Sequence, residues 1–315
     1  MKKNIWLVGT GSMARDYTKV LTALECEVLA IGRSVESVEK FKAETRIPAM
    51  CGGLGKYLKT NPIVPDAAIV AVGVEDLSAV ARELIEYGVK KILLEKPGAL
   101  EMGDLLALQE VAILLGAEVF IAYNRRFYTS VLEAKKRIDI DGGARSFNFE
   151  FTEWNHVIEG LKKDRRVKDA WFMANSTHVA DMAFFLGGAP EKIHCLHRGS
   201  LDWHKASARF AGAGVSSGDV LFSYTANWDA PGRWFVEILT ENYRFIFKPL
   251  EALQVVHKGR VVVEDVPIDD ELDRSFKPGL YRQVEEFLNG KTEQLCGLDY
   301  HLKMWPIYNQ MAGYE

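Results

Sequence analysis

The stretch Ile5-Trp6-Leu7-Val8-Gly9-Thr10-Gly11-Ser12-Met13-Ala14 decides the fold. Its four apolar residues are typical of a strand buried on both faces of a parallel sheet. The rest fits the pattern G-x-G-x-x-G/A: Gly9 permits the tight turn, Gly11 lets a pyrophosphate approach the backbone, and Ala14 allows close helix packing. We therefore expect a helix over 12–24 whose N-terminus receives the phosphates of a dinucleotide.

The first 122 residues alternate between strand-like and helical patterns. Continuous apolar runs are bounded by turn residues, and the segments between them carry apolar residues at helix spacing. This alternation predicts an α/β domain over residues 1–122, with a doubly wound parallel sheet that binds a dinucleotide. The further strands are expected at 27–31, 67–72, 91–94 and 119–122, and the helices at 35–45, 77–87 and 105–115.

The end of the second expected strand bears on the choice of cofactor. An NAD-specific site has an acidic residue about 20 residues after the glycines, where it binds the ribose hydroxyls. This chain has Gly32-Arg33-Ser34 there, and no carboxylate before Glu36. Arg33 offers a fixed charge to a 2′-phosphate, and Ser34 adds a hydroxyl. The pattern favours NADP(H) over NAD(H); the alternative is that Arg33 is a solvated turn residue.

The second half predicts a different architecture. Single cores stop growing at roughly 250–300 residues, so a chain of 315 residues predicts a second domain, over 123–315. Phe147, Phe149 and Phe151 alternate with polar residues, as in a half-buried strand. We expect an α+β domain with a large, mostly antiparallel open sheet, and a C-terminal helix able to pack back on the first domain. Further strands are expected at 206–210, 220–228, 233–240, 243–247, 253–257 and 261–263, and helices at 129–138, from 176, at 280–288 and at 299–311 with an interruption at Pro306.

Composition excludes several classes of protein. A net charge of −4 argues against a nucleic-acid-binding protein, which usually has a basic excess. The four cysteines are scattered without a C-x-x-C pair, which favours free thiols in a reducing cytoplasm over disulfides or a zinc site. No run approaches the ~18 apolar residues that span a bilayer, and the apolar run near the N-terminus is too short for a signal peptide. We expect a cytoplasmic protein with no metal and no membrane partner.

Three motifs join the glycine pattern. Glu95-Lys96-Pro97 ends the strand at 91–94, Tyr123-Asn124-Arg125-Arg126-Phe127 follows the strand at 119–122, and His178-Val179-Ala180-Asp181 opens an apolar helix. Together they resemble the glucose–fructose oxidoreductase / inositol dehydrogenase / rhizopine-catabolism (Gfo/Idh/MocA) family, over positions 9–188. The resemblance implies an NAD(P)-dependent dehydrogenase or reductase of sugar-like substrates. It also implies a homodimer or a higher homo-oligomer, assembled through the exposed sheet face.

The resemblance gives Lys96 and His178 the catalytic roles. Lys96 is expected to contact the nicotinamide end of the cofactor and the reacting hydroxyl or carbonyl, and His178 to take part in proton transfer. A free lysine, with a pKa near ~10.4, is too basic to accept a proton readily, but burial and a neighbouring cation disfavour its charge. A protonated Lys96 can still polarise a carbonyl. The alternatives are a structural lysine paired with Glu95 and a structural histidine on an apolar helix.

One position departs from the family. Many members have an aspartate four residues before the histidine, whereas position 174 is Ala. Asn175 and Ser176 can hydrogen-bond a substrate, but neither is a general base at ordinary pH. Asp181, one turn after His178, either orients it or caps and packs the helix. Ala174 therefore leaves two alternatives open: a catalytically impaired NADP-binding sensor, or an enzyme that recycles a tightly held cofactor.

Two groups of site residues complete the prediction. Arg126 and Phe127 have two interpretations each. Both can contact the substrate, or Arg126 is a surface charge and Phe127 a core aromatic residue, which is at least as plausible. The basic run at 162–168 is a solvated face or, alternatively, holds a phosphate-bearing substrate such as a nucleotide sugar through Arg165, Arg166 or Lys168. The residues expected to bind the cofactor are Gly9, Thr10, Gly11, Ser12, Met13, Arg33, Ser34, Val72, Gly73, Glu95, Lys96 and Pro97, and those expected to bind the substrate are Tyr123, Asn124, Arg125, Asn175 and Asp181.

Overall fold

The computed structural model describes residues 2–314, and its chain divides into two compact units. The first comprises Met1–Asn124 and Arg274–Leu302, and the second Arg125–Asp273 and Lys303–Glu315. The segment Arg274–Leu302, which we predicted to lie in the second domain, thus belongs to the first unit. The reason is local packing, because helix α11 (Leu280–Asn289) buries its apolar side against that unit.

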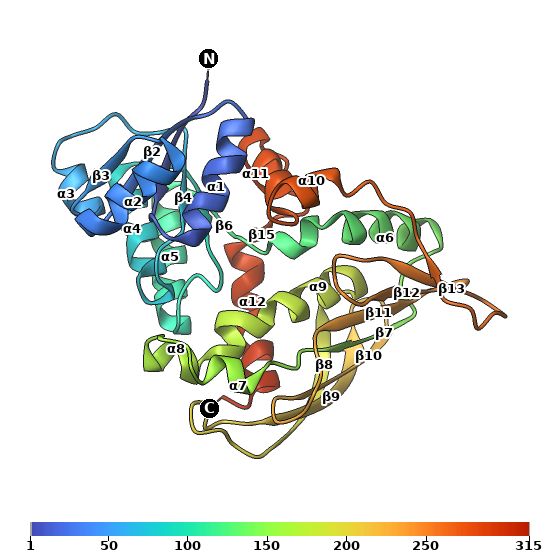
Figure 1. Ribbon diagram of the computed structural model, residues 1–315. Coiled ribbons are helices and arrows are strands. Elements are labelled where there is room, and N and C mark those ends of the chain that lie inside the picture. The colour runs from blue at the N-terminus through green and yellow to red at the C-terminus, as the bar shows by residue number, and fades with distance from the viewer. Residues whose placement is uncertain (1, 315) are drawn as a thin grey trace. The chain divides into compact units, whose positions relative to one another are not determined.

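The first unit contains a seven-stranded sheet in the order β15-β6-β5-β4-β1-β2-β3. Its strands run parallel except β15, which pairs antiparallel with β6. In Figure 1 the helix α11 lies beside α1, although the two are far apart in the sequence. The strands are β1 (Asn4–Val8), β2 (Glu27–Gly32), β3 (Ala49–Cys51), β4 (Ala67–Val70), β5 (Lys91–Leu94), β6 (Glu118–Ile121) and β15 (Cys296–Gly297), and the helices are α1 (Ser12–Ala23), α2 (Val35–Thr45), α3 (Leu54–Leu58), α4 (Leu77–Tyr87) and α5 (Met102–Leu115), with a short η1 (Val74–Asp76).

The predicted doubly wound sheet is confirmed. Apart from the first residues of β1 and β5, Asn4 and Lys91, its central strands are apolar and buried, as the continuous apolar runs predicted. Such strands need cover on both faces, which the helices between them supply. The parallel order brings the carboxyl ends of β1, β4 and β5 to one edge, since β4 lies between the other two.

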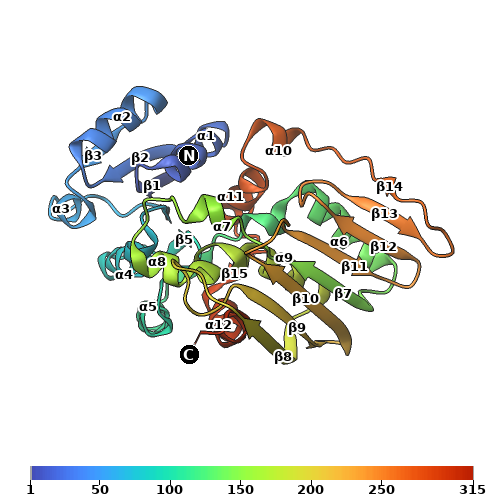
Figure 2. The ribbon, with the colours of Figure 1, turned by 60° about the horizontal axis from the view of Figure 1, so that its bottom comes forward.

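The second unit contains an eight-stranded sheet in the order β14-β13-β12-β11-β7-β10-β9-β8. All its pairings are antiparallel except that of β7 with β10, so the predicted mostly antiparallel sheet is also confirmed. Figure 2 shows the strands fanning out side by side. The strands are β7 (Ser146–Glu150), β8 (Pro190–Arg198), β9 (Arg209–Ser216), β10 (Val220–Asn227), β11 (Phe235–Leu239), β12 (Tyr243–Phe247), β13 (Gln254–His257) and β14 (Glu264–Asp265), and the helical segments are η2 (Asn124–Phe127), α6 (Thr129–Ile140), α7 (Asn155–Ile158), α8 (Arg165–Asp169), the π-helical turn η3 (Phe172–Ser176), α9 (Thr177–Gly187), α10 (Glu271–Ser275) and α12 (Leu298–Ala312).

Aromatic side chains build the core of this unit. Phe147 and Phe149 on β7 meet the ring of Phe184 on α9 at centroid distances of 5.9 and 5.5 Å. Phe147 also stacks on Phe222 of the neighbouring strand β10 at 5.2 Å. The alternation seen in the sequence at 146–152 therefore buries one face of β7 under α9, as predicted.

The prediction of strands and helices in this half of the chain was wrong at four places. Strand β8 was missed because its side chains are mostly half-exposed or exposed, and the strand expected at 206–210 begins only at Arg209. The apolar residues 261–263 are exposed and form no strand. Helix α12 is not interrupted at Pro306. That proline lies on the exposed side of the helix, while buried residues on either side of it hold the helix in place.

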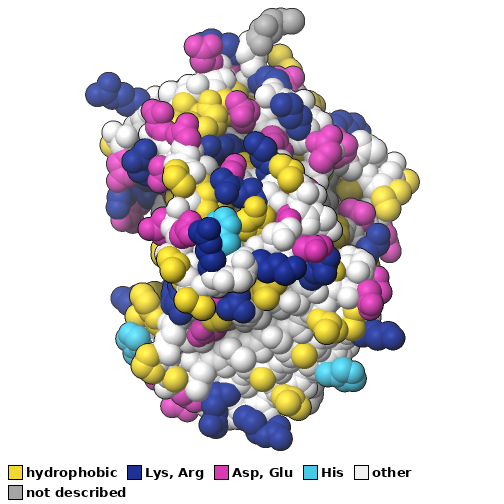
Figure 3. All heavy atoms as spheres, turned by 90° about the vertical axis from the view of Figure 1, so that its right-hand side faces the viewer, with side chains coloured by type: hydrophobic (Ala, Val, Ile, Leu, Met, Phe, Trp, Pro, Cys, Tyr) yellow, Lys and Arg dark blue, Asp and Glu magenta, His cyan; other side chains and the backbone are white. Residues whose placement is uncertain are grey.

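The surface mixes charges of both signs. On the face drawn in Figure 3, Lys and Arg side chains are interspersed with Asp and Glu, without a large area of one sign. This distribution agrees with a net charge of only −4. Across residues 2–314, none of the helices combines the length and the apolarity needed to cross a membrane.

Candidate active site

The glycine loop after β1 has the geometry of a dinucleotide-binding turn. Gly9 has a φ of +124°, and a Cβ there would lie 2.2 Å from the carbonyl oxygen of Ala71. A Cβ on Gly11, by contrast, would meet no atom within 4 Å. Gly11 caps α1, which has no acidic residue in its first turn and no side-chain cap. The open space and the uncapped helix N-terminus fit a pyrophosphate.

The two glycines predict opposite outcomes when each is replaced by alanine. Gly9→Ala forces a strained φ and a clash with the backbone, so we expect a clear loss of thermal stability. Gly11→Ala is compatible with its φ of −80° and should fold within ~0.5 kcal/mol of the wild type. Its methyl group fills the space offered to the pyrophosphate, so NADH and NADPH should bind more weakly. Thermal unfolding and nucleotide fluorescence titrations measure both effects; unchanged nucleotide affinity in Gly11→Ala would contradict this placement.

Arg33 and Ser34 follow β2, as predicted, but each has a local partner. Arg33 is exposed, and its Nη1 lies 2.8 Å from Oδ2 of Asp76. The Ser34 hydroxyl accepts a hydrogen bond from the backbone N–H of Ser37 and so caps α2. Thr10 in the glycine loop is 2.7 Å from the Ser37 hydroxyl.

The Glu95-Lys96-Pro97 turn follows β5 and is held by other elements of the first unit. The hydroxyl of Tyr17, on α1, donates to Oε1 of Glu95 at 2.7 Å. Burial raises the pKa of Glu95, while Tyr17 and the charges of Lys96 and Lys277 oppose that rise. The Lys96–Pro97 peptide bond is cis, and Nε2 of His301 lies 2.9 Å from the carbonyl oxygen of Pro97.

This arrangement bears on the structural interpretation of Lys96. Among the described residues, the Glu95 carboxylate is hydrogen-bonded by Tyr17 and forms no ion pair within 4.0 Å. A direct Glu95–Lys96 ion pair is therefore not what fixes the turn. Tyr17 was not predicted as part of this site, because a tyrosine on the buried side of α1 is usually a core residue. Val72 and Gly73 follow β4, next to the Glu95 turn, whose N–H donates to the carbonyl of Val70 at 3.0 Å.

Tyr123 and Asn124, predicted to bind substrate, are both buried in the first unit. The side-chain amide of Asn124 donates to the carbonyl of Pro278 at 2.8 Å. The ring of Tyr123 lies 5.6 Å from that of His301. These contacts fasten the end of the first segment to the returning segment Arg274–Leu302, which is a structural role.

Arg126 is not the surface charge that we considered. Its Nε and Nη2 donate to the two carboxylate oxygens of Asp181 at 2.8 and 2.6 Å, and both side chains are buried. Both oxygens of the Asp181 carboxylate are thus engaged by Arg126, a partner that the prediction did not include. Phe127 is a core aromatic, as expected.

Arg125 has a quite different environment. Its Cζ lies 4.8 Å from the ring centroid of Trp234 and 5.8 Å from that of Tyr128. Burial lowers the pKa of Arg125, and the charge of Arg233 acts in the same direction. The imidazole of His178 is buried, and its centroid is 6.4 Å from that of Trp234. Arg125, His178 and Arg233 thus lie around the ring of Trp234, and the prediction of the site named neither Arg233 nor Trp234.

Glu153 is a second residue that the sequence did not reveal. Its Oε1 accepts hydrogen bonds from Nδ2 of Asn175 at 2.8 Å and from the hydroxyl of Ser176 at 2.7 Å. The Ser176 side chain therefore does not cap α9, although Ser176 immediately precedes that helix. The carboxylate is buried and ties η3, where Ala174 lies, to the end of β7. The only signal in the sequence was a carboxylate soon after an alternating strand.

The basic run at 162–168 behaves as a solvated face. Arg165 pairs with Asp169 one helical turn later at 2.9 Å, and Arg166 with Asp164 at 3.1 Å. All four side chains are exposed. Cations already paired in water in this way offer little to a phosphate.

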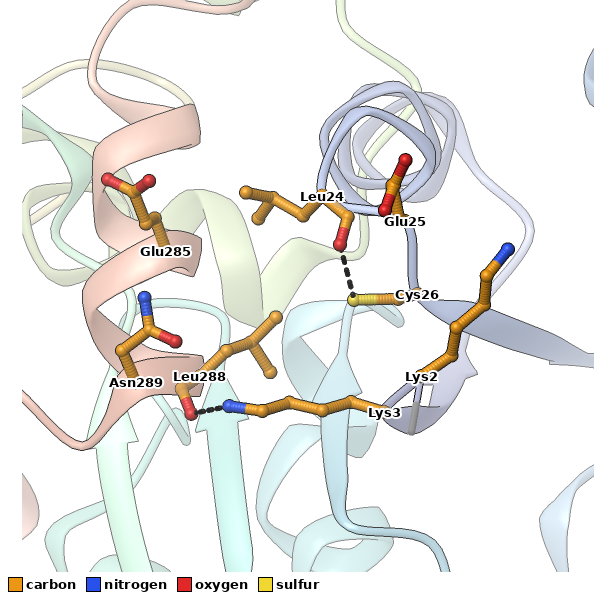
Figure 4. Close-up of a pocket in the computed structure, with 8 residues that line it drawn as sticks. All are labelled: Lys2, Lys3, Leu24, Glu25, Cys26, Glu285, Leu288 and Asn289. Atoms are coloured by element: carbon orange, nitrogen blue, oxygen red, sulfur yellow. Dashed lines mark hydrogen bonds between the residues drawn. The ribbon is translucent and has the colours of Figure 1, made fainter.

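A shallow hollow lies in the first unit, away from the glycine loop. Figure 4 shows it between α11 and the segment before β1, with Lys3 donating to the carbonyl of Leu288. Its other residues include Cys26, just before β2. It therefore lies at the amino ends of β1 and β2, whereas parallel sheets bind ligands at the carboxyl ends.

The comparison with known families decides the assignment. Residues 3–123 match the GFO_IDH_MocA family model, described as an oxidoreductase family with an NAD-binding Rossmann fold. Over these residues the chain has the NAD-binding Rossmann domain of this oxidoreductase family. The match confirms the predicted family and the NAD(P)-dependent oxidoreductase class. No curated protein matches the chain in sequence.

Solved structures share the fold of the whole chain. UDP-N-acetylglucosamine 3-dehydrogenase GnnA from Acidithiobacillus ferrooxidans has a TM-score of 0.78 at 16% identity, covering 100% of this chain and 98% of its own. A levoglucosan dehydrogenase in complex with NADH and L-sorbose reaches 0.81 at 16% identity, covering 99% and 96%. An oxidoreductase from Desulfitobacterium hafniense, described as putatively NADPH-dependent, reaches 0.82 at 15% identity, covering 99% and 95%. At these identities the likeness concerns the fold alone.

Proposed function

We propose that this protein transfers a hydride between NADP(H) and a secondary alcohol or carbonyl of a sugar-like substrate, including nucleotide sugars. The observation that carries the proposal is the Glu95-Lys96-Pro97 turn at the carboxyl end of β5. It lies at the same sheet edge as the glycine loop, where open parallel sheets bind their ligands. One structural neighbour is named for a nucleotide sugar and another for its complex with NADH and L-sorbose, which supports this substrate class.

The residues present fit a dinucleotide. Gly9 and Gly11 leave the backbone open to phosphates, and Ser12 and Met13 begin the helix whose N-terminus faces them. When bound, the nicotinamide accepts or supplies the hydride. In the proposed reaction Lys96 hydrogen-bonds the reacting oxygen, and His178 gives or takes the proton. These two roles rest on the family resemblance together with the location of Lys96 after β5.

Turnover is tested with the full chain, NADPH or NADP⁺, and a panel of sugars and nucleotide sugars. The absorbance of the reduced nicotinamide is followed in both directions. We expect oxidation or reduction with at least one member. Nucleotide binding without turnover across the panel would favour the alternative, a catalytically impaired NADP-binding sensor, for which Ala174 is the specific observation. Cofactor that copurifies with the protein would instead indicate a tightly held, recycled cofactor.

Cofactor preference has a separate test. Arg33→Ala should weaken NADPH binding about tenfold or more, because a charge-assisted contact to the 2′-phosphate is lost, and should leave NADH nearly unchanged. Asp76→Asn should strengthen NADPH binding, since it releases Arg33 from its present partner. Arg82→Ala, which breaks the exposed pair with Glu86, serves as the control. Equal losses for NADPH and NADH in Arg33→Ala would contradict the preference.

The proposal extends to assembly and location. The resemblance suggests a homodimer or higher homo-oligomer through the open face of the second sheet, and the exposed Leu196 and Leu221 on β8 and β10 support it. Light scattering of the purified chain tests the oligomer. We propose a cytoplasmic location, supported by four free cysteines.

A further inference from the structure

Two guanidinium groups of the second unit lie against one tryptophan ring. Cζ of Arg125 is 4.8 Å from the ring centroid of Trp234, and Cζ of Arg233 is 4.7 Å from it. Two like charges at this spacing repel each other. Burial is the main cause that lowers the pKa of Arg125; Tyr128, Glu251 and Glu153 oppose this, and Arg233 adds a smaller lowering effect. An arrangement that concentrates positive charge in this way is stabilised when an anion joins it.

Arg125 and Arg126 are adjacent in the sequence but differ in the partners of their guanidinium groups. Arg126 is held by both oxygens of the buried Asp181. Arg125 lies against the rings of Tyr128 and Trp234, and within residues 2–314 its guanidinium forms no ion pair within 4.0 Å. Its Nε is buried without an acceptor. A guanidinium group has five N–H donors and cannot accept a hydrogen bond. The buried Nε–H of Arg125 therefore lacks the oxygen acceptor that it needs.

Trp234 adds a second unsatisfied donor. The side chain is 5% exposed, and its Nε1 is buried with no acceptor among the described residues. Indole nitrogens only donate, and buried donors are nearly always paired. Two orphaned donors on neighbouring side chains therefore point to a missing acceptor group.

The carboxylates nearby do not fill this need. Glu153 lies 3.6 Å from Arg233, but its short hydrogen bonds go to Asn175 and Ser176. Glu251 is exposed and acts on Arg125 only as a more distant charge. Both guanidinium groups thus keep donors that an oxyanion could engage as a fork.

There is room for a sugar beside this cluster. A hollow of about 440 Å³ is lined by Glu153, Trp154 and residues 228–232. Trp154 is 47% exposed, and its ring also lies 4.8 Å from Cζ of Arg233. An exposed indole face next to hydrogen-bonding groups suits the apolar face of a sugar ring.

We propose that Arg125 and Arg233, together with Nε1 of Trp234, form a receptor for an oxyanion on the substrate, so the substrate is an acidic or phosphorylated sugar rather than a neutral one. This rests on the proposed sugar oxidoreductase function. It also replaces the basic run at 162–168 as the source of charge recognition. The cluster adjoins His178, whose ring is 6.4 Å from Trp234, so the anion is bound in the neighbourhood of the proposed proton-transfer residue.

The test is isothermal titration calorimetry on the full chain at matched ionic strength. The probes are glucuronate, glucose 6-phosphate and glucose. At least one anionic sugar should bind about tenfold or more tightly than glucose, and Arg233→Met should remove that preference. Arg233→Lys distinguishes a phosphate from a carboxylate as the anion. A lysine can still bind a phosphate as a point charge, so most of the affinity for glucose 6-phosphate should remain. It cannot form the paired hydrogen bonds of a guanidinium to a carboxylate, so the affinity for glucuronate should be lost.

Arg165→Met, which removes an exposed guanidinium on α8, is the matched control and should keep the wild-type preference. Arg233 is half-exposed, so its variants are expected to fold; near-ultraviolet circular dichroism verifies this. The proposal is overturned if glucose binds as well as both anions, if none of the three binds, or if Arg233→Met leaves the preference intact. Anion binding without any nicotinamide oxidation or reduction would count against the proposed function alone.

Discussion

Replacing Lys96 by methionine is expected to lower kcat by about 10²–10⁴-fold, the usual contribution of a group that transfers or holds a proton at the reacting atom. Methionine keeps most of the length of the side chain and removes its charge. Nucleotide binding should change little, because we propose that the glycine loop, not Lys96, binds the phosphates. Stopped-flow measurement of hydride transfer separates the chemical step from binding.

Lys40→Met provides the control for this experiment. Lys40 lies on the exposed side of α2, so its variant should match the wild type in both turnover and binding. If Lys96→Met turned over at the wild-type rate, Lys96 would be a structural residue of its turn. The enzyme proposal would then need another residue at the reacting oxygen.

Asp181→Asn is expected to lower the free energy of unfolding of the second unit by about 3–5 kcal/mol. The variant leaves the buried guanidinium of Arg126 without its countercharge, and breaking one side of a buried ion pair has a cost of this size. Denaturant unfolding, followed by tryptophan fluorescence, measures it. The large effect comes from the unpaired charge rather than from the lost hydrogen bonds.

Two further variants separate these causes. Asp169→Asn breaks the exposed pair with Arg165, so it should change stability by less than about 1 kcal/mol. The double variant Arg126→Met/Asp181→Leu removes both charges and should recover most of the stability lost in Asp181→Asn. A double variant as unstable as Asp181→Asn would mean that the shape of the pair, not its charge, holds α9 against η2.

The first sheet was predictable from the sequence because each of its buried strands is identified by the apolar residues of that strand alone. A strand buried on both faces must be apolar throughout, and Ile5–Val8 or Ala67–Val70 have no other stable environment. The antiparallel sheet was harder. β8 exposes side chains such as Leu196, so its pattern is weak, while the apolar but exposed 261–263 imitates a strand.

In the candidate site, only residues that belong to a short sequence motif could be predicted. The glycine loop and Lys96 stand at the ends of predicted strands, so their positions follow from the sheet. Glu153 and Trp234 come from distant segments, and no periodicity indicates that they share the neighbourhood of Ser176 and His178. Likewise, nothing in the pair Arg125-Arg126 tells which arginine is neutralised, because Asp181 is 55 residues away from Arg126.

The division of the chain limits how the two units can be connected. The backbone passes between them after Asn124, after Asp273 and after Leu302. Each of these points lies inside a helical segment, namely η2, α10 and α12. The covalent links are thus three regular, hydrogen-bonded turns instead of one flexible linker. Because each unit is built from two separate stretches of the chain, neither can be obtained by simply cutting the gene in two.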